Sequence, residues 1–288
     1  MGMEAELVLD THSLLGEGAI WDPATGRLYW VDIDPGLVHV YNPADGDNRT
    51  VKVGQPVGTI VPRAKGGTMV ALRDGFGALD PGTGALELWS NPEAGIPGNR
   101  FNDGKCDPAG RFWAGTLGTS GGALYRLDAD RSVTKLFGGV KTSNGIVWTK
   151  DLKSMYYIDT GTGRVDAFDY DHATGAVANR RPAVTVPKET GRPDGCTLDA
   201  EGMLWVAMWE GWGVVRYNPA TGQELSRVKV PVSRVTSVAF GGPDLKTLYI
   251  TTSSYSLKEA DKATQPHAGG LFKVVPGVTG VPAVAYAG

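Results

Sequence analysis

Sulfur and imidazole side chains are scarce in this sequence of 288 residues, which holds two cysteines and four histidines. Two cysteines, Cys106 and Cys196, cannot build the disulfide framework of a small secreted protein, and they fit a reducing compartment. The histidines are dispersed, and no Cys/His spacing is typical of a structural zinc site. This composition argues against disulfide-dependent folding and against a zinc-finger module.

Long apolar runs and an excess of positive charge are also missing. No run approaches the length of about 20 residues that a membrane-spanning helix needs, and the N-terminal segment MGMEAELVLD lacks the charged-then-apolar pattern of a signal peptide. A formal net charge of −3 offers no basic surface for nucleic acid or anionic lipid. We therefore expect a cytoplasmic protein, a monomer or weak homo-oligomer, with no nucleic-acid or membrane partner.

Helical periodicity is nearly absent, with one weak candidate at 256–263, whereas alternating runs bounded by Asp-Pro, Thr-Gly and Gly-Gly occur throughout. The 41 glycines and 18 prolines follow no G-X-Y period and are typical of turns between many short strands. A chain of this length can bury about three quarters of its unfolded surface. The sequence predicts an all-β protein that forms a single domain over residues 1–288.

One strand-like unit recurs along the chain. Its six copies are GRLYWVD (26–32), GGTMVAL (66–72), GRFWAGT (110–116), KSMYYID (153–159), GMLWVAM (202–208) and KTLYITT (246–252). Equivalent positions are 40, 44, 43, 49 and 44 residues apart. A period in the forties that contains about four strands is the signature of a β-propeller blade. The repeat predicts a six-bladed β-propeller with four-stranded blades around a central channel.

Closure of the ring requires that the edge between the last and first blades be covered, because an open strand edge promotes aggregation. Both ends of the chain, AELVLD (5–10) and AVAYAG (283–288), look like strands. One terminus is therefore expected to supply the closing strand, and the sequence does not distinguish between them.

Four polar residues stand at matched places in the repeat, just before innermost strands that otherwise look buried. Each lies 10 or 11 residues before the equivalent core position of its unit, and the four are Glu17, Asn102, Asn144 and Asp194. The second and sixth units hold Val57 and Ser237 at this place, so the polar set is not a general feature of the repeat. Because equivalent positions of blades converge on one axis, we expect the four side chains to meet at one mouth of the channel.

Carboxylate and carboxamide oxygens are the ligands that hard divalent cations prefer, so the four residues predict a site for Ca²⁺, Mg²⁺ or Mn²⁺. A sparse protein shell leaves coordination positions open, as metal-assisted hydrolysis requires. Arg100 lies two residues before Asn102 and shares its side of the strand, where it could bind hydroxyls or a carboxylate. The alternative is that these residues cap strands by bonding turn amides. We expect Asp103 to be structural, and Cys106 and Cys196 to be small core residues.

A competing motif, G-x-S-x-G, occurs at residues 118–122 and places a serine at Ser120. In serine hydrolases this motif forms a sharp turn from a strand into a helix. Here it lies between two strand-like segments, GRFWAGT and ALYRLD. We therefore expect Ser120 to lie in a hairpin loop and to take no part in catalysis.

Several motifs resemble the SMP-30/gluconolactonase family, which includes regucalcin. They are GEGAIWD, NRFNDGKCDPAGRFWAGT, SNGIVW, YYIDTGTGRVDAFDYD, RPDGCTLDAEGMLWVA and FGGPDLKTLYITT, and they cover nearly the whole chain, with the family region at about 14–254. The resemblance implies a six-bladed propeller that holds one divalent metal cation. It also implies that the protein hydrolyses sugar (aldono) lactones, such as gluconolactone, to the aldonic acid. Ca²⁺ is favoured as the cation, and Zn²⁺, Mg²⁺ and Mn²⁺ are the alternatives.

Matched motif by motif, the resemblance places the metal ligands on Glu17, Asn144 and Asp194. It places the substrate contacts on Arg100 and Asn102, and it makes Asp194 the catalytic proton acceptor as well. Several relatives carry a longer loop after the AGT strand with an acidic residue that contacts substrate. Here the loop at 117–122, LGTSGG, is short and has no acid, so a more open pocket is expected.

Three other functions are compatible with the sequence. A related propeller could hydrolyse aryl esters or phosphotriesters on the same scaffold. A calcium-binding regulatory protein would bind the cation without turnover. A protein-interaction platform would need a contiguous apolar face, and no turn in this sequence is unusually apolar. Because propellers host many functions, the choice depends on the site, and the site favours a hydrolase. The resemblance implies that its substrate is a small-molecule lactone.

Overall fold

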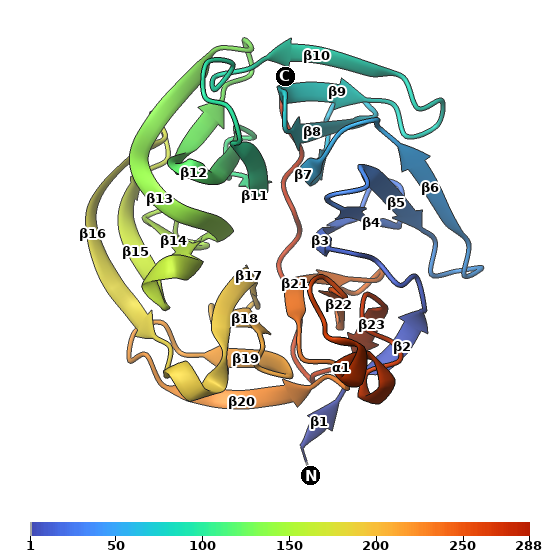
Figure 1. Cartoon of the computed structure of the whole chain (residues 1–288). Coiled ribbons are helices and arrows are strands. Elements are labelled where there is room, and N and C mark those ends of the chain that lie inside the picture. The colour runs from blue at the N-terminus through green and yellow to red at the C-terminus, as the bar shows by residue number, and fades with distance from the viewer. Residues whose placement is uncertain (1) are drawn as a thin grey trace.

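The computed structural model describes residues 2–288, and this part of the chain is built from β-strands with one short α-helix, α1 (Glu259–Thr264). The strands form sheets arranged like blades around a central axis, with one edge strand of each sheet nearest the axis (Figure 1). The all-β prediction is therefore confirmed. No helix within residues 2–288 has the length and apolar character that crossing a membrane would require.

The strands group into five sheets, and all neighbours pair antiparallel except β1 with β20. The first sheet contains β3 (Gly16–Asp22), β4 (Arg27–Asp32), β5 (Leu37–Tyr41) and β6 (Asn48–Lys52), and the second contains β7 (Val57–Pro62), β8 (Thr68–Leu72), β9 (Gly75–Leu79) and β10 (Leu86–Ser90). The third contains β11 (Arg100–Cys106), β12 (Phe112–Leu127), β13 (Val133–Trp148), β14 (Ser154–Asp159), β15 (Arg164–Asp171) and β16 (Ala176–Thr185). The fourth contains β17 (Arg192–Leu198), β18 (Leu204–Trp209), β19 (Gly213–Tyr217), β20 (Glu224–Lys229) and β1 (Met3–Glu4), and the fifth contains β21 (Val235–Gly241), β22 (Thr247–Thr252), β23 (Leu271–Val274) and β2 (Glu6–Leu9). Two 3₁₀ turns, η1 (Thr160–Thr162) and η2 (Lys188–Thr190), complete the elements.

The prediction of six four-stranded blades is wrong. Counted as continuous hydrogen-bonded sheets, the propeller has five blades of four to six strands. The third and fourth repeat units are fused by β13, whose first part pairs with β12 up to Thr142 and whose second part pairs with β14 from Ser143 onward. One strand thus leaves the outside of one unit and becomes the inner strand of the next, as its curved path shows (Figure 1).

The chain also reverses within β12. Ala123 N donates to Thr116 Oγ1 at 2.9 Å, although seven residues of extended strand would separate these groups by about 23 Å. The reversal lies at residues 117–122, where Ser120 is exposed. The long β12 is therefore a hairpin in shape. Its second arm pairs with the first part of β13, and the second part of β13 pairs with the next unit.

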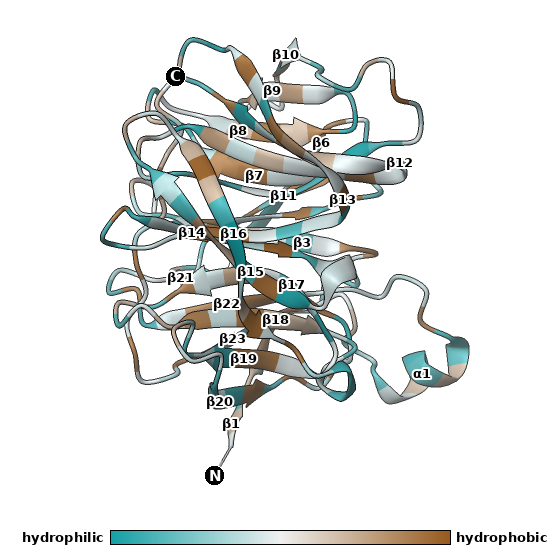
Figure 2. Ribbon diagram, turned by 90° about the vertical axis from the view of Figure 1, so that its left-hand side faces the viewer, coloured by the Kyte–Doolittle hydropathy of each residue, from teal (hydrophilic) through white to brown (hydrophobic). Residues whose placement is uncertain are grey.

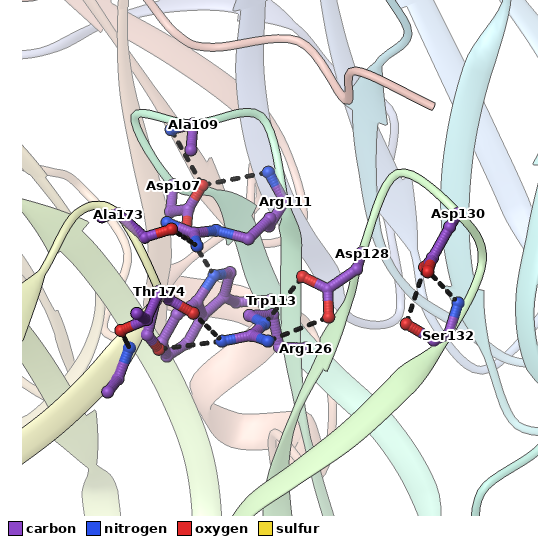
Figure 3. Close-up of polar contacts among 12 residues, drawn as sticks. Asp107, Ala109, Arg111, Trp113, Arg126, Asp128, Asp130, Ser132, Ala173 and Thr174 are labelled. Carbon is purple, nitrogen blue, oxygen red and sulfur yellow. Dashed lines mark hydrogen bonds and ion pairs between the residues drawn. The ribbon is translucent and has the colours of Figure 1, made fainter.

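A polar network, buried at Asp107 and partly exposed at Arg126, ties this six-stranded sheet together (Figure 3). Asp107 Oδ2 accepts from Arg111 Nε at 2.6 Å and from Trp113 Nε1 at 3.0 Å. On the same side, Arg126 Nη1 donates to the carbonyl of Thr174 at 2.8 Å, in the turn between β15 and β16. Charge-assisted bonds of this kind are stronger than neutral ones when they are buried. The network therefore holds the turns of two repeat units in a fixed relation.

The N-terminal segment closes the ring. β2 pairs with β23 and becomes the outer strand of the fifth sheet, so the last blade is built from both ends of the described chain. The C-terminal segment, residues 275–288, instead crosses the centre of the ring (Figure 1). Its backbone bonds to the turns that follow inner strands, with Tyr286 N donating to Pro62 O at 2.8 Å and Ala287 N to Gly110 O at 2.9 Å. This segment covers one end of the channel, above a small cavity of about 100 Å³.

Candidate functional site

Every inner strand that carries a predicted site residue is irregular at that residue. The pairing register shifts between Glu17 and Ile20 in β3, between Phe101 and Gly104 in β11, between Ser143 and Ile146 in β13 and between Pro193 and Cys196 in β17. A β-bulge bends a strand and re-aims a side chain, and bulges are common next to active sites. The shift also occurs in β7 and β21, so the bulge is a feature of all the inner strands, and four of them carry a predicted polar residue at it.

A glycine accompanies these bulges and allows the inner strands to approach one another closely. A Cβ atom added at Gly145 would lie 2.7 Å from Cys196 N, and one at Gly195 would lie 2.8 Å from Thr236 O. Both contacts involve neighbouring backbone, so neither could be relieved by moving a side chain. A polar residue followed by glycine, as in Asn144-Gly145 and Asp194-Gly195, is thus a local sequence signal of the site. The spacing of the repeat does not depend on this signal.

The structure brings all the predicted site residues to one open cavity of about 370 Å³. The cavity is lined by Glu17, Arg100, Asn102, Asn144 and Asp194. The loop that leads to α1 also contributes to the lining, so the cavity opens on the face from which α1 projects (Figure 2). The C-terminus lies at the opposite face (Figure 2). A volume of this size is within the range of sites for small molecules.

Two carboxyl groups meet at the floor of this cavity. Glu17 and Asp194 are 3% and 5% exposed, and their side chains are hydrogen-bonded to each other. Burial raises the pKa of Glu17 to about 8, with the charge of Asp103 adding to the effect. Burial, followed by the charge of Glu17, also raises the pKa of Asp194 well above its ordinary value. In the cation-free protein the pair therefore holds at least one proton at neutral pH, since two adjacent buried charges would repel each other.

The amide of Asn144 is oriented by a chain of hydrogen bonds. Thr160 Oγ1 donates its proton to Pro193 O at 2.7 Å, so toward Asn144 this hydroxyl can act only as an acceptor. It accepts from Asn144 Nδ2, the amide nitrogen, at 2.7 Å. Asn144 Oδ1 is left on the other side, where Asn102 Nδ2 donates to it at 3.0 Å. The carboxamide oxygen of Asn144 is thus fixed in orientation by Thr160, a residue that the sequence analysis did not select.

Arg100 and Asn102 form a unit on β11. Arg100 Nη1 donates to Asn102 Oδ1 at 2.7 Å and to Phe101 O at 3.0 Å. Asn102 Nδ2 also donates to Ser143 O at 2.7 Å, so the amide of Asn102 is bonded on both sides. The remaining donors of the Arg100 guanidinium are available to a ligand in the cavity.

The donor set fits a hard divalent cation. Asp194 Oδ1 is buried and has no hydrogen-bond partner among residues 2–288, which is costly for a carboxyl oxygen unless a ligand satisfies it. Two carboxyl groups and one carboxamide oxygen are the ligand types that Ca²⁺ and Mg²⁺ favour. Within residues 2–288 there is no cluster of three or more His, Cys, Asp or Glu side chains suited to a metal, so the carboxamide of Asn144 is needed to complete such a set.

Several cavity residues were missed by the sequence analysis. Beside Thr160, they are Arg192, Trp209, Glu210, Arg234 and Tyr255. They come from strand ends and loops that do not occupy the matched offset of the repeat, so the spacing argument could not reach them. Arg192 stands directly in the motif RPDG, and a cation two residues before Asp194 was the one available signal.

Ser120 lies apart from this constellation. Its side chain is exposed at the reversal of β12 and is not among the residues that line the cavity. No hydrogen bond joins Ser120 to a histidine anywhere in residues 2–288. Cys106 and Cys196 are both buried as free thiols, consistent with small core residues.

The fold and the cavity define a β-propeller whose channel carries an oxygen-rich, carboxyl-containing pocket at one mouth. The family model described as the SMP-30/Gluconolactonase/LRE-like region matches residues 15–254. The chain belongs to this family, and the resemblance seen in the motifs is confirmed.

Individual relatives match along almost their entire length. The chain is 41% identical to the Bacillus subtilis protein named "Putative sugar lactone lactonase YvrE", with 99% of each chain covered. It is 38% identical to regucalcin of Xenopus laevis, again with 99% of each chain covered. Among solved structures, a regucalcin from Agrobacterium tumefaciens, described as a calcium-binding protein, superposes with a TM-score of 0.94 at 30% identity and covers 99% of this chain and 98% of its own.

Proposed function

We propose that this protein is a divalent-metal-dependent hydrolase that opens sugar lactones, such as gluconolactone, to their aldonic acids. The observation that carries the proposal is the buried pair of Glu17 and Asp194, with one unpartnered carboxyl oxygen, at the floor of an open cavity. Relatives named for sugar lactone hydrolysis support the reaction class, and the relative described as calcium-binding supports the cation.

The cation would be held by Glu17, Asn144 and Asp194, with Ca²⁺ favoured by the all-oxygen set and Zn²⁺, Mg²⁺ or Mn²⁺ as alternatives. When bound, a divalent cation polarises a carbonyl group and stabilises the negative charge that develops on its oxygen. Thr160 would contribute by presenting the oxygen of Asn144, rather than its nitrogen, to the cation.

The chain's own side chains supply the remaining chemistry. Asp194 accepts a proton from the water that adds to the lactone carbonyl carbon. The bond between that carbon and the ring oxygen then breaks, and the ring oxygen receives the proton that Asp194 accepted, so Asp194 is regenerated as the aldonic acid forms. Arg100 binds ring hydroxyls through its free donors, and Asn102 keeps the Arg100 guanidinium in place.

The proposal is tested with a pH-indicator assay on enzyme that has been treated with a chelator and then refilled with single cations. Five- and six-membered sugar lactones are compared with aryl esters and phosphotriesters. We expect turnover of sugar lactones that is lost on chelation and restored by a divalent cation. Turnover that survives complete chelation would exclude the cation, and preferential turnover of aryl or phosphate esters would move the activity to another hydrolase class.

Asp194→Asn keeps an oxygen ligand but removes the base, so it should lose nearly all turnover. The matched control is Asp171→Asn, because Asp171 lies in an exposed turn that an asparagine can also form. If Asp194→Asn hydrolysed lactones at the parental rate, Asp194 would not be the base. Calcium binding without turnover of any lactone or ester would identify a regulatory calcium-binding protein instead.

A further inference from the structure

Two arginines and a tryptophan form one wall of the cavity, away from the carboxyl pair. Arg192 and Trp209 are directly paired in the β17–β18 ladder, and an isolated bridge joins Trp209 to Arg234. The guanidinium carbons of Arg234 and Arg192 lie 5.0 and 6.0 Å from the centroid of the Trp209 ring. All three residues line the cavity. Because both cations lie against the ring, Trp209 serves to position them rather than to stack on a sugar.

Arg234 lacks the partners that a buried guanidinium needs. Its side chain is only 12% exposed, and its Nε and Nη1 groups are buried with no hydrogen-bond partner in the described part of the chain. The third nitrogen of the guanidinium, Arg234 Nη2, donates a hydrogen bond to a neutral acceptor, the carbonyl oxygen of Ser256, at 3.1 Å. Buried polar groups without partners cost free energy, and a buried charge without a close counter-charge costs more. The unpaired donors therefore indicate a ligand that bears acceptor oxygens.

Glu210 is the acidic side chain that lines this wall, with the charge of Asp261 in α1 acting on Arg234 less strongly, and Glu210 does not neutralise both arginines. Arg192 Nη2 donates to Glu210 Oε2 at 2.9 Å, whereas Arg234 is 4.0 Å from the other oxygen. Glu210 is about half exposed, so its pairing is screened by solvent. Apart from the carboxyl pair at the floor, the charged residues that line the cavity are three arginines and one glutamate, namely Arg100, Arg192, Arg234 and Glu210.

We propose that this wall, formed by Arg192, Trp209 and Arg234, selects lactones that carry a second, anionic group, either a carboxylate or a phosphate, on the part of the sugar remote from the lactone carbonyl. This inference rests on the proposed lactonase function, because it assigns the other end of the same substrate. Arginine binds carboxylate and phosphate through paired donors, and such charge-assisted bonds are about twice as strong as neutral ones. A neutral sugar lactone would leave the excess positive charge of this wall unmatched.

The test compares substrates of equal ring size that differ in charge. Glucono-1,5-lactone is compared with 6-phosphoglucono-1,5-lactone, and glucono-1,4-lactone with glucaro-1,4-lactone, each corrected for spontaneous hydrolysis. We expect kcat/KM to be higher for the charged member of at least one pair by about tenfold, the effect of one charge-assisted bond. The two pairs distinguish phosphate from carboxylate. Equal or lower kcat/KM for both charged lactones would overturn the proposal.

Variants that remove either a positive or a negative charge from the wall extend this test. Arg234→Gln and the more exposed Arg192→Gln should each lower the ratio of charged to neutral kcat/KM, whereas Glu210→Gln should raise it. The matched control is Arg181→Gln, which removes an exposed arginine paired with Asp169 far from the cavity lining. Raising the salt from about 0.01 to about 1 M should shrink the parental ratio, because screening lengths fall from about 30 to about 3 Å. A ratio that is the same in all four variants would refute the assignment.

Binding of reaction products separates this inference from the proposed function. Titration calorimetry with 6-phosphogluconate, glucarate and gluconate needs no turnover. If the protein hydrolyses no lactone but binds one of the doubly anionic products more tightly than gluconate, the lactonase proposal fails and the anion-selective wall stands. If lactones are hydrolysed without any preference for charge, the reverse holds.

Discussion

Replacement of Asp194 by asparagine should stabilise the cation-free protein while it removes the activity. Asp194 and Glu17 are both buried and hydrogen-bonded to each other, and the pKa of Asp194 is raised by burial and by the charge of Glu17. A carboxyl group whose pKa is raised on folding stabilises the folded state fully only below its unfolded pKa. Its contribution is lost as the pH rises toward the folded pKa, so the parent protein is penalised at neutral pH.

The size of this penalty follows from the cost of keeping the proton. The ordinary pKa of aspartic acid is 3.8, so keeping a proton on such a group costs at most about 4 kcal/mol at pH 7 and at most about 2 kcal/mol at pH 5. Asparagine has no proton to hold, and its amide can still donate to Glu17. These figures are upper limits to the gain in free energy of unfolding. Half of the gain at pH 7, about 2 kcal/mol, corresponds to a rise in Tm of about 3 °C for a chain of 288 residues.

The measurement is thermal and urea unfolding of the parent and of Asp194→Asn in chelator, at pH 5 and at pH 7. The variant should gain more at pH 7 than at pH 5. Adding Ca²⁺ should raise the Tm of the parent, because a ligand that binds only the folded state stabilises it, and should raise that of the variant less. Asp171→Asn controls for the loss of one carboxylate elsewhere. A variant that is no more stable than the parent at either pH would show that the carboxyl pair is not strained.

Three further predictions concern single residues. Thr160→Val should lower cation affinity by about tenfold in calorimetry, because Asn144 loses the hydroxyl that orients it, while Thr160→Ser should retain it. Ser120→Ala should keep kcat within about threefold of the parent and resist serine-directed phosphonates, and a folded but inactive variant would indicate a covalent mechanism. Burial lowers the pKa of His39 to about 4, so protonation of His39 should by itself remove up to about 3 kcal/mol of unfolding free energy as the pH falls from 6.5 to 4, and His39→Gln should lack this contribution in the same urea titrations.

The sequence was informative about the site because the repeat converts spacing along the chain into position around an axis. The matched offsets of Glu17, Asn102, Asn144 and Asp194 place all four on one cavity, as the structure does. The same argument could not predict Arg234, which comes from the segment before β21 and reaches the cavity through a bridge to Trp209. Contacts of this kind depend on how neighbouring sheets meet, and no local pattern encodes that.

The error in the blade count has a comparable cause. A repeat period identifies units, but it does not say whether the outer strand of one unit ends before the inner strand of the next begins. In β13 the strand continues, because Thr142 still pairs with Leu117 of β12 while Ser143 already pairs with Asp159 of β14. The continuity depends on the length of the β12 hairpin, a property of the pairing partner rather than of the β13 sequence.

The close packing of the inner strands explains why the carboxyl pair cannot relax. Backbone of the strand that carries Asp194 lies where a side chain at Gly145 would stand, so the backbone at Asp194 cannot shift toward this neighbour without displacing a strand of the ring. The ring is closed through β2 and β23, which opposes such a displacement. A proton or a cation is then the available means of relieving the repulsion. On this argument, the geometry that makes the cation-free protein less stable is the same geometry that gives it affinity for a divalent cation.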